Sequence, residues 1–241
     1  MGSNYVIIGG SSDIAKCVID ELKRSGSEVT TLIRNNEDLE TWDYSGIEVV
    51  IGDATSQEDI LKCIEKAGEK GDIDAVAHCV GSVLIRPPHA LKKPDFEEVI
   101  ATNLTSAFLT LSLAGKKMLK QKHGRIIFTS SVAASLGLVN HEAIAAAKGG
   151  IEAMARSAAA TYAKRGIRIN VVAPGLTDTK MTSSMITNPA SREVAESKIP
   201  IGRINQKEEA GETIAWLMKD APDNLTGQVI HLDGGMSEVL C

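Results

Sequence analysis

The chain has 241 residues, of which 43% are hydrophobic and 24% are charged. This length can bury a full core in one domain, and the composition excludes a disordered chain, a collagen and a small disulfide scaffold. The formal charge is −5 and the basic residues are scattered, so we expect no nucleic-acid partner.

The cysteines and histidines show no spacing typical of a metal site, so we expect no metal. The four cysteines, Cys17, Cys63, Cys79 and Cys241, stand far apart, as suits a reducing cytosol. The first residues carry no basic segment followed by an apolar one, and no apolar run reaches the ~18 residues of a membrane span. We therefore expect a cytoplasmic protein without a membrane contact.

Seven short runs rich in β-branched residues predict strands over residues 5–8, 29–33, 47–51, 73–78, 125–129, 168–172 and 228–232. Helical patterns lie between them, over residues 14–24, 57–68, 96–120, 142–164 and 208–218. Strand and helix alternate, and crossovers of this length favour parallel pairing. The pattern predicts one α/β domain over residues 1–241, a doubly wound, Rossmann-type sheet of seven parallel strands with helices on both faces. The irregular stretch 177–206 is a candidate substrate lid.

The first predicted strand runs directly into Gly9-Gly10-Ser11-Ser12-Asp13-Ile14-Ala15 and then a helix. In a sheet of this kind a dinucleotide's pyrophosphate meets backbone N–H groups at that place, which makes Gly9, Ser11, Ser12, Asp13 and Ile14 candidate contacts. Asp13 stands where a strict glycine pattern wants glycine, and an anion close to a phosphate is unfavourable. The alternative is an ordinary turn in which Ser12 or Asp13 caps the helix.

Arg34 follows the second predicted strand, where an NAD site carries an acid and an NADP site a base. The sequence therefore predicts NADP(H) in preference to NAD(H). A solvated arginine at a strand end is the alternative.

Further motifs follow in chain order: Gly52-Asp53-Ala54, Cys79-Val80-Gly81, Ala101-Thr102-Asn103-Leu104, Thr129-Ser130-Ser131-Val132, Pro174-Gly175 and Thr226-Gly227-Gln228 to Asp233-Gly234-Gly235. With the loop at Gly9 they resemble the short-chain dehydrogenase/reductase family over nearly the whole chain. The resemblance is greatest to the 3-oxoacyl-carrier-protein reductases. It implies a nicotinamide-dependent enzyme that acts on a small carbonyl or alcohol.

The resemblance also implies roles for individual residues. Asn103, Ser131 and Lys148 correspond to catalytic positions, and Lys148 would also bind the cofactor ribose. Only the spacing to Lys148 favours Ser131 over Ser130. Further cofactor contacts implied by the resemblance are Asp53, Ala54, Val80, Gly81, Pro174, Gly175 and Thr179.

One departure concerns the family's Tyr-x-x-x-Lys motif, because Ile144-Ala145-Ala146-Ala147-Lys148 stands in its place. In the mechanism that the resemblance implies, the phenol protonates the carbonyl oxygen, and isoleucine has no acid–base chemistry. His141 lies three residues before Ile144, on the same helical face. An imidazole titrates near neutrality, so His141 with Ser131 is a candidate replacement. The alternative is a loop or helix-capping residue.

Three functions remain open from the sequence. The first is an NADP-dependent oxidoreductase with an active site that lacks the tyrosine. The second is a catalytically lapsed protein that binds a cofactor or serves as a scaffold. The third is a non-redox enzyme that uses His141 and Ser131. By analogy with the family we expect a homodimer or homotetramer, built on the two long predicted helices.

Overall fold

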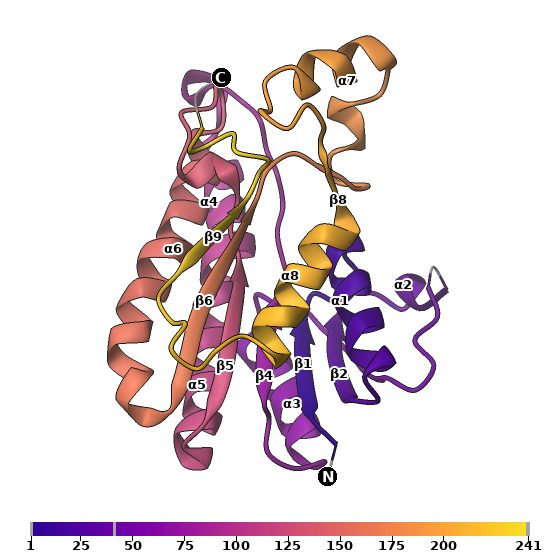
Figure 1. The fold of residues 1–241 in the computed structure, drawn as a ribbon, viewed down its shortest axis with the longest axis vertical. Helices are drawn as coiled ribbons and strands as arrows, with labels where there is room; N and C mark the ends of the chain where they lie inside the picture. The colour runs from indigo at the N-terminus through magenta and orange to yellow at the C-terminus, as the bar shows by residue number, and fades with distance from the viewer. Residues whose placement is uncertain (1, 41, 240–241) are drawn as a thin grey trace.

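A parallel sheet of seven strands forms the centre of the computed structural model, which describes residues 2–40 and 42–239 (Figure 1). The prediction of a doubly wound sheet is confirmed, and the strands run in the order β3-β2-β1-β4-β5-β6-β9. The chain order reverses between β1 and β4, where open α/β sheets bind ligands. The strands are β1 (Asn4–Ile8), β2 (Glu28–Ile33), β3 (Glu48–Ile51), β4 (Ala75–His78), β5 (Gly124–Thr129), β6 (Ile167–Pro174) and β9 (Val229–Leu232).

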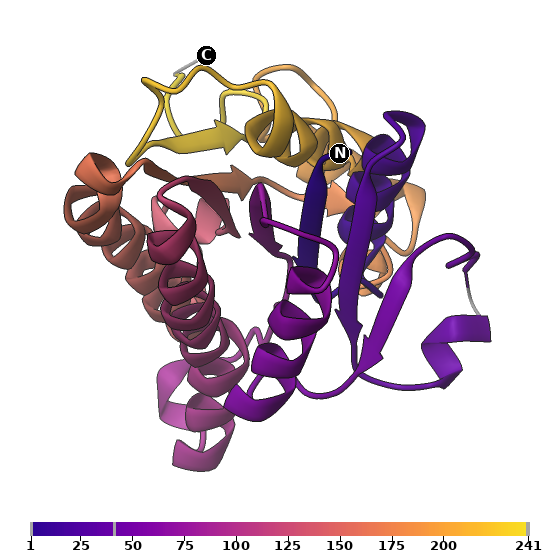
Figure 2. The ribbon, with the colours of Figure 1, turned by 90° about the horizontal axis from the view of Figure 1, so that it is seen from below.

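Helices cover both faces of the sheet, as Figure 2 shows from below. One face carries α1 (Asp13–Arg24) and α8 (Lys207–Lys219), and the other carries α3 (Gln57–Gly68), α5 (Ser106–Gln121) and α6 (Glu142–Tyr162). Each face has its own buried apolar cluster, because strands covered on both sides bury side chains in both directions. A short α2 (Glu37–Glu40) follows β2.

The predicted helix over residues 96–120 is present, but it contains a π-helical turn. It is divided into α4 (Lys93–Ile100), a π-helical turn (Ala101–Thr105) and α5. Side chains satisfy carbonyl groups at this turn: Asn103 Nδ2 donates to Val99 O at 2.9 Å, and Ser106 Oγ donates to Thr102 O at 2.6 Å. Such turns often occur at functional sites.

The stretch 177–206, expected to be irregular, contains β7 (Thr177–Asp178), a 3₁₀ turn (Ser183–Met185), α7 (Pro189–Glu196) and β8 (Asn205–Gln206). The Asn188 side chain caps α7, and proline at the first helical position suits this start. β7 pairs with β8, so the two ends of the stretch lie side by side. Between them, α7 lies beyond the end of the sheet (Figure 1).

Across the described part of the chain, no helix is long and apolar enough to cross a bilayer. Nor do residues 2–40 and 42–239 bring together three or more His, Cys, Asp or Glu side chains in a way that could hold a metal. Cys17, Cys63 and Cys79 are free thiols, and Cys241 lies outside the described residues.

Helices α1 and α8 pack so closely that Gly211 has no room for a side chain: a Cβ there would lie 2.5 Å from Cys17 Cβ. We expect Gly211→Ala to lower the free energy of unfolding by about 1–3 kcal/mol, as overpacking does, in urea denaturation. Gly149→Ala is the matched control, because the added Cβ would have nothing within 4 Å and the change favours the helix. Equal stability of the two variants would contradict this packing.

Candidate active site

The carboxyl ends of β4, β5 and β6 and the start of α1 surround a cavity of about 330 Å³, here called the central cavity. This position agrees with the general rule for ligand sites in open α/β sheets. Its lining comprises Ser11, Ser12, Asp13, Ile14, Cys79, Val80, Gly81, Ser82, Val83, Thr129, Ser130, Ser131, Ile144, Lys148, Pro174, Gly175, Thr177, Thr179, Lys180, Met181 and Thr182.

A second cavity of about 340 Å³, the flanking cavity, lies over the ends of β1, β2 and β3. Five residues line both cavities, so the two adjoin beside residues 9–14, the loop after β1 that is here called the phosphate loop. The shared residues are Ser11, Ser12, Cys79, Val80 and Gly81. Together the cavities form an elongated site on both sides of the point where the chain order reverses.

The loop after β1 lies directly against the residues that follow β4. Gly9 has a φ of +90°, and a Cβ at this position would lie 2.7 Å from Val80 Cγ2. The backbone N–H groups of Gly9 and Gly10 both donate to Leu32 O, at 3.0 Å each. Ser12 then caps α1, because its Oγ accepts from the Ala15 N–H at 3.2 Å. The helix therefore begins at the wall of both cavities.

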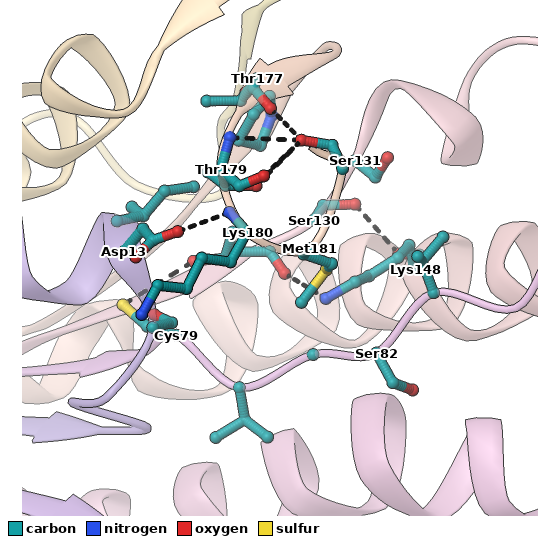
Figure 3. A pocket seen from close by; sticks show the side chains of 18 of the residues that line it. Asp13, Cys79, Ser82, Ser130, Ser131, Lys148, Thr177, Thr179, Lys180 and Met181 are labelled. Atoms are coloured by element: carbon teal, nitrogen blue, oxygen red, sulfur yellow. Dashed lines mark hydrogen bonds between the residues drawn. The ribbon is translucent and has the colours of Figure 1, made fainter. Parts of the chain in front are cut away.

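Asp13 points away from the flanking cavity. Its carboxylate Oδ2 accepts a hydrogen bond from the backbone N–H of Lys180 at 2.7 Å (Figure 3). Asp13 thus lines only the central cavity, where it contacts the segment that follows β7.

Ile144 and Lys148 lie one helical turn apart on α6, and both line the central cavity. Ile144 is 3% exposed and belongs to an apolar cluster with Val99 and Ala147. Lys148 is 6% exposed, and its Nζ donates to Thr129 O at 2.9 Å. The cavity wall therefore has an apolar surface next to a buried amine.

The two serines after β5 differ in their hydrogen bonds. Ser130 is buried, and its Oγ donates to Glu152 Oε1 at 2.7 Å. The Oγ of Ser131 accepts from the Ala133 N–H at 3.2 Å, so its own proton is not used in that contact. Ser131 is therefore the better placed of the two to donate to a ligand oxygen.

Two of the predicted catalytic residues do not line either cavity. Asn103 lies behind Gly81 and Ser82, where its Oδ1 accepts from the Ser82 N–H at 3.2 Å and its Nδ2 donates to Ser82 Oγ at 3.0 Å. His141 is the residue before α6, and its Nδ1 lies 2.8 Å from Val139 O at the surface. The structure does not bring His141 to the cavity.

Arg34 and Ala54 line the flanking cavity, together with Gly52, but Asp53 does not. The Asp53 carboxylate instead accepts from the N–H and the hydroxyl of Thr55, both at 2.7 Å. These hydrogen bonds, with the Arg34 charge as a smaller contribution, lower the pKa of Asp53.

Comparisons with known proteins identify the family of this chain. Residues 9–237 match the family model described as enoyl-(acyl carrier protein) reductase. The 3-oxoacyl-acyl-carrier-protein reductase FabG of Escherichia coli (strain K12) is 30% identical, over 98% of this chain and 97% of that protein. A chloroplastic tropinone reductase homolog of Arabidopsis thaliana is 31% identical, over 98% of this chain and 76% of its own length. The chain belongs to the short-chain dehydrogenase/reductase family.

The solved structure of ElxO with NADP bound has the same fold as this short-chain dehydrogenase/reductase. The two share 26% identity with a TM-score of 0.91, over 98% of this chain and 99% of ElxO. A variant of ElxO with phenylalanine for one tyrosine, solved with NADPH bound, is equally similar.

Several residues that line the central cavity of this short-chain dehydrogenase/reductase were not predicted from the sequence. Ser82, Val83, Thr177, Lys180, Met181 and Thr182 all belong to this group. Each follows β4 or β6 by a few residues, so their position at the carboxyl ends of strands was the available signal.

Burial controls the titratable groups beside the central cavity. It lowers the pKa of Lys148 to about 8 and raises the pKa of the Cys79 thiol to about 12. Behind them, burial and the nearby charge of Lys148 lower the pKa of His78 to about 3. Near neutral pH, Lys148 is thus the group among these three that changes protonation most readily.

The low pKa of Lys148 has a consequence for stability. In the unfolded chain the amine titrates near 10.5, so between about pH 8 and 10.5 the unfolded state binds more protons than the folded state. The contribution of Lys148 to the free energy of unfolding therefore rises with pH across that window. Below about pH 8 the full cost of burying the charged amine destabilises the folded state.

We expect Lys148→Met, which keeps the apolar stem, to raise the Tm of the cofactor-free protein by a few degrees at neutral pH, with a gain that shrinks toward pH ~10. Differential scanning calorimetry at several pH values measures this difference. Lys116→Met, on the exposed side of α5, removes the same charge without relieving burial and is the control. A lower Tm for Lys148→Met at every pH would contradict the expectation.

Proposed function

We propose that this protein is an NADP-dependent oxidoreductase that interconverts a carbonyl and an alcohol on a small molecule, with an active site that lacks the tyrosine. The observation that carries the proposal is the convergence of Ser131, Lys148 and the start of α1 on one cavity, with Ile144 on the same wall. Family membership and the NADP-bound ElxO structure support the choice of chemistry.

The residues of the two cavities suit a dinucleotide. Gly9 leaves no side chain between the loop and β4, and Ser11 and Ser12 lie at the α1 N-terminus, which attracts phosphate. Arg34 in the flanking cavity would meet a 2′-phosphate, and Ala54 would lie beside the adenine. Pro174, Gly175 and Thr179 line the central cavity and would hold the nicotinamide end, with Val80 and Gly81 between the two ends.

When bound, the nicotinamide would supply or accept the hydride. In the direction of reduction, the Ser131 hydroxyl donates a hydrogen bond to the substrate oxygen. The Lys148 ammonium is the proton source, because its pKa of about 8 keeps it charged but acidic near neutral pH. Ile144 contributes an apolar wall, and Asn103 holds the Ser82 backbone that forms the opposite side.

We extend the proposal to assembly and location. We expect a homodimer or homotetramer in the cytoplasm, formed through α5 and α6. Phe108 on α5 is 56% exposed, which is a large apolar surface for a helix of a free monomer.

The second candidate is a protein that binds the cofactor without hydride transfer. The apolar packing of Ile144 against Val99 and Ala147 favours it. At this position the cavity wall belongs to an apolar cluster and carries no group that could donate or accept a proton. Binding alone would then survive, as in the ElxO variant that holds NADPH with one phenol removed.

Titration with NADPH and with NADH, followed by nucleotide fluorescence or calorimetry, tests the cofactor. We expect tighter binding of NADPH, and we expect Arg34→Gln to weaken NADPH binding by about 10-fold or more while leaving NADH binding unchanged, because the lost contact is charge-assisted. Arg24→Gln, at the far end of α1, is the control. Failure of the wild-type protein to bind either nucleotide would refute the proposal.

Replacing Ile144 tests the missing phenol. We expect Ile144→Tyr to raise kcat for NADPH oxidation with a panel of small ketones and aldehydes by about 10²-fold, the usual contribution of a positioned general acid. Ile144→Phe adds the ring without the hydroxyl and should stay at the wild-type rate or below it. If tyrosine gives no gain over phenylalanine while both variants bind NADPH, the second candidate takes precedence.

A further inference from the structure

Asp13 joins two walls of the central cavity that are far apart in sequence. It is the first residue of α1, and its Oδ2 accepts from the Lys180 N–H at 2.7 Å, across 167 residues (Figure 3). A hydrogen bond to a carboxylate is stronger than a neutral one. The contact therefore connects the phosphate loop directly to the 177–206 segment.

The cap of α1 does not account for the Asp13 carboxylate. The capping bond at the start of α1 comes from Ser12, whose Oγ accepts from the Ala15 N–H. The Asp13 Oδ2 accepts instead from the Lys180 N–H, on the side of the central cavity. The bond to Lys180 gives the acid at this position a specific partner.

The backbone that Asp13 holds is a firm turn. The Thr179 N–H donates to Thr182 Oγ1 at 3.3 Å, the Thr182 N–H donates to Thr179 O at 3.2 Å, and Thr182 Oγ1 donates to Thr177 O. Thr177, Thr179, Lys180, Met181 and Thr182 all line the central cavity. The bond that holds the Lys180 backbone therefore also holds the wall of the central cavity formed by residues 177–182.

The far part of the segment has its own attachments. Thr177 pairs with Asn205 where β7 meets β8, and Arg192 of α7 lies 3.1 Å from the Asp178 carboxylate. These contacts tie the segment to itself and to its base. Asp13 supplies a tie from the segment to the phosphate loop.

We propose that Asp13 is a positioning residue that fastens the 177–206 segment to the phosphate loop and so holds Thr179 and Met181 over the central cavity. The consequence for cofactor binding rests on the proposed function, but the fastening itself does not. Loss of the carboxylate leaves the Lys180 N–H without this acceptor and loosens the Thr177–Thr182 turn. The affinity of the central cavity for its ligand falls as a result.

Hydrogen exchange followed by mass spectrometry tests the bond directly in the full chain without nucleotide. In Asp13→Ala we expect exchange in peptides covering residues 176–186 to accelerate about 10-fold, as loss of one charge-assisted bond implies. Asp13→Asn keeps an acceptor oxygen of the same shape and should stay within about threefold of wild type. Lys180→Ala keeps the backbone donor and should match wild type after correction for intrinsic rates.

The asparagine variant separates the bond from a charge effect at the α1 N-terminus, since it removes the charge and retains the acceptor. Unchanged exchange in Asp13→Ala, or equal acceleration in Asp13→Ala and Asp13→Asn, overturns the proposal. In the same variants we expect the Kd for NADPH to rise about 10-fold only in Asp13→Ala. Accelerated exchange with an unaltered Kd for NADPH also overturns the positioning role. If the wild-type protein does not bind NADPH, the proposed function is refuted. The exchange result alone then tests whether Asp13 fastens the 177–206 segment.

Discussion

The turn between β1 and α1 passes so close to the segment after β4 that only glycine fits at position 9. A Cβ there would lie 2.7 Å from Val80 Cγ2, and the backbone has a φ of +90° that other residues avoid. This approach occurs where the strand order reverses, so the residues after β1 and those after β4 become neighbours. Both cavities share Val80 and Gly81 for that reason. Arg34 lies on one side of this contact, in the flanking cavity, and Lys148 lies on the other side, in the central cavity.

The architecture was accessible from the sequence because the signals were long and repeated. The seven β-branched runs, separated by helical patterns, allow little besides a parallel sheet covered on both faces, and the structure has that sheet. Residues that directly follow strands were also predictable as cavity lining. Ser131 follows β5 and Gly175 follows β6, and parallel strands bring such positions to one edge whatever their side chains.

Sequence patterns were incomplete for three residues, each for a different physical reason. Local sequence gives no sign of the bond between Asp13 and Lys180, because the two residues are 167 positions apart. His141 has the helical spacing to Ile144, but its backbone has already left the helix, with φ −102° and ψ 12°, so the imidazole lies against Val139 O. Asp53 turns to Thr55, two residues on, by an Asx-type contact that competes with any ligand.

The π-helical turn at Ala101–Thr105 has a consequence for how this chain can vary. It holds one residue more than an α-helix of the same length needs, and each helical residue advances the side chains by ~100°. The extra residue lets α4 direct Val99 toward the start of α6 while α5 directs Ala107 and Leu111 toward the sheet. A single-residue deletion there would restore a uniform helix and rotate one of these two stripes out of its cluster. The number of residues in this turn thus sets the rotation of one packing surface relative to the other.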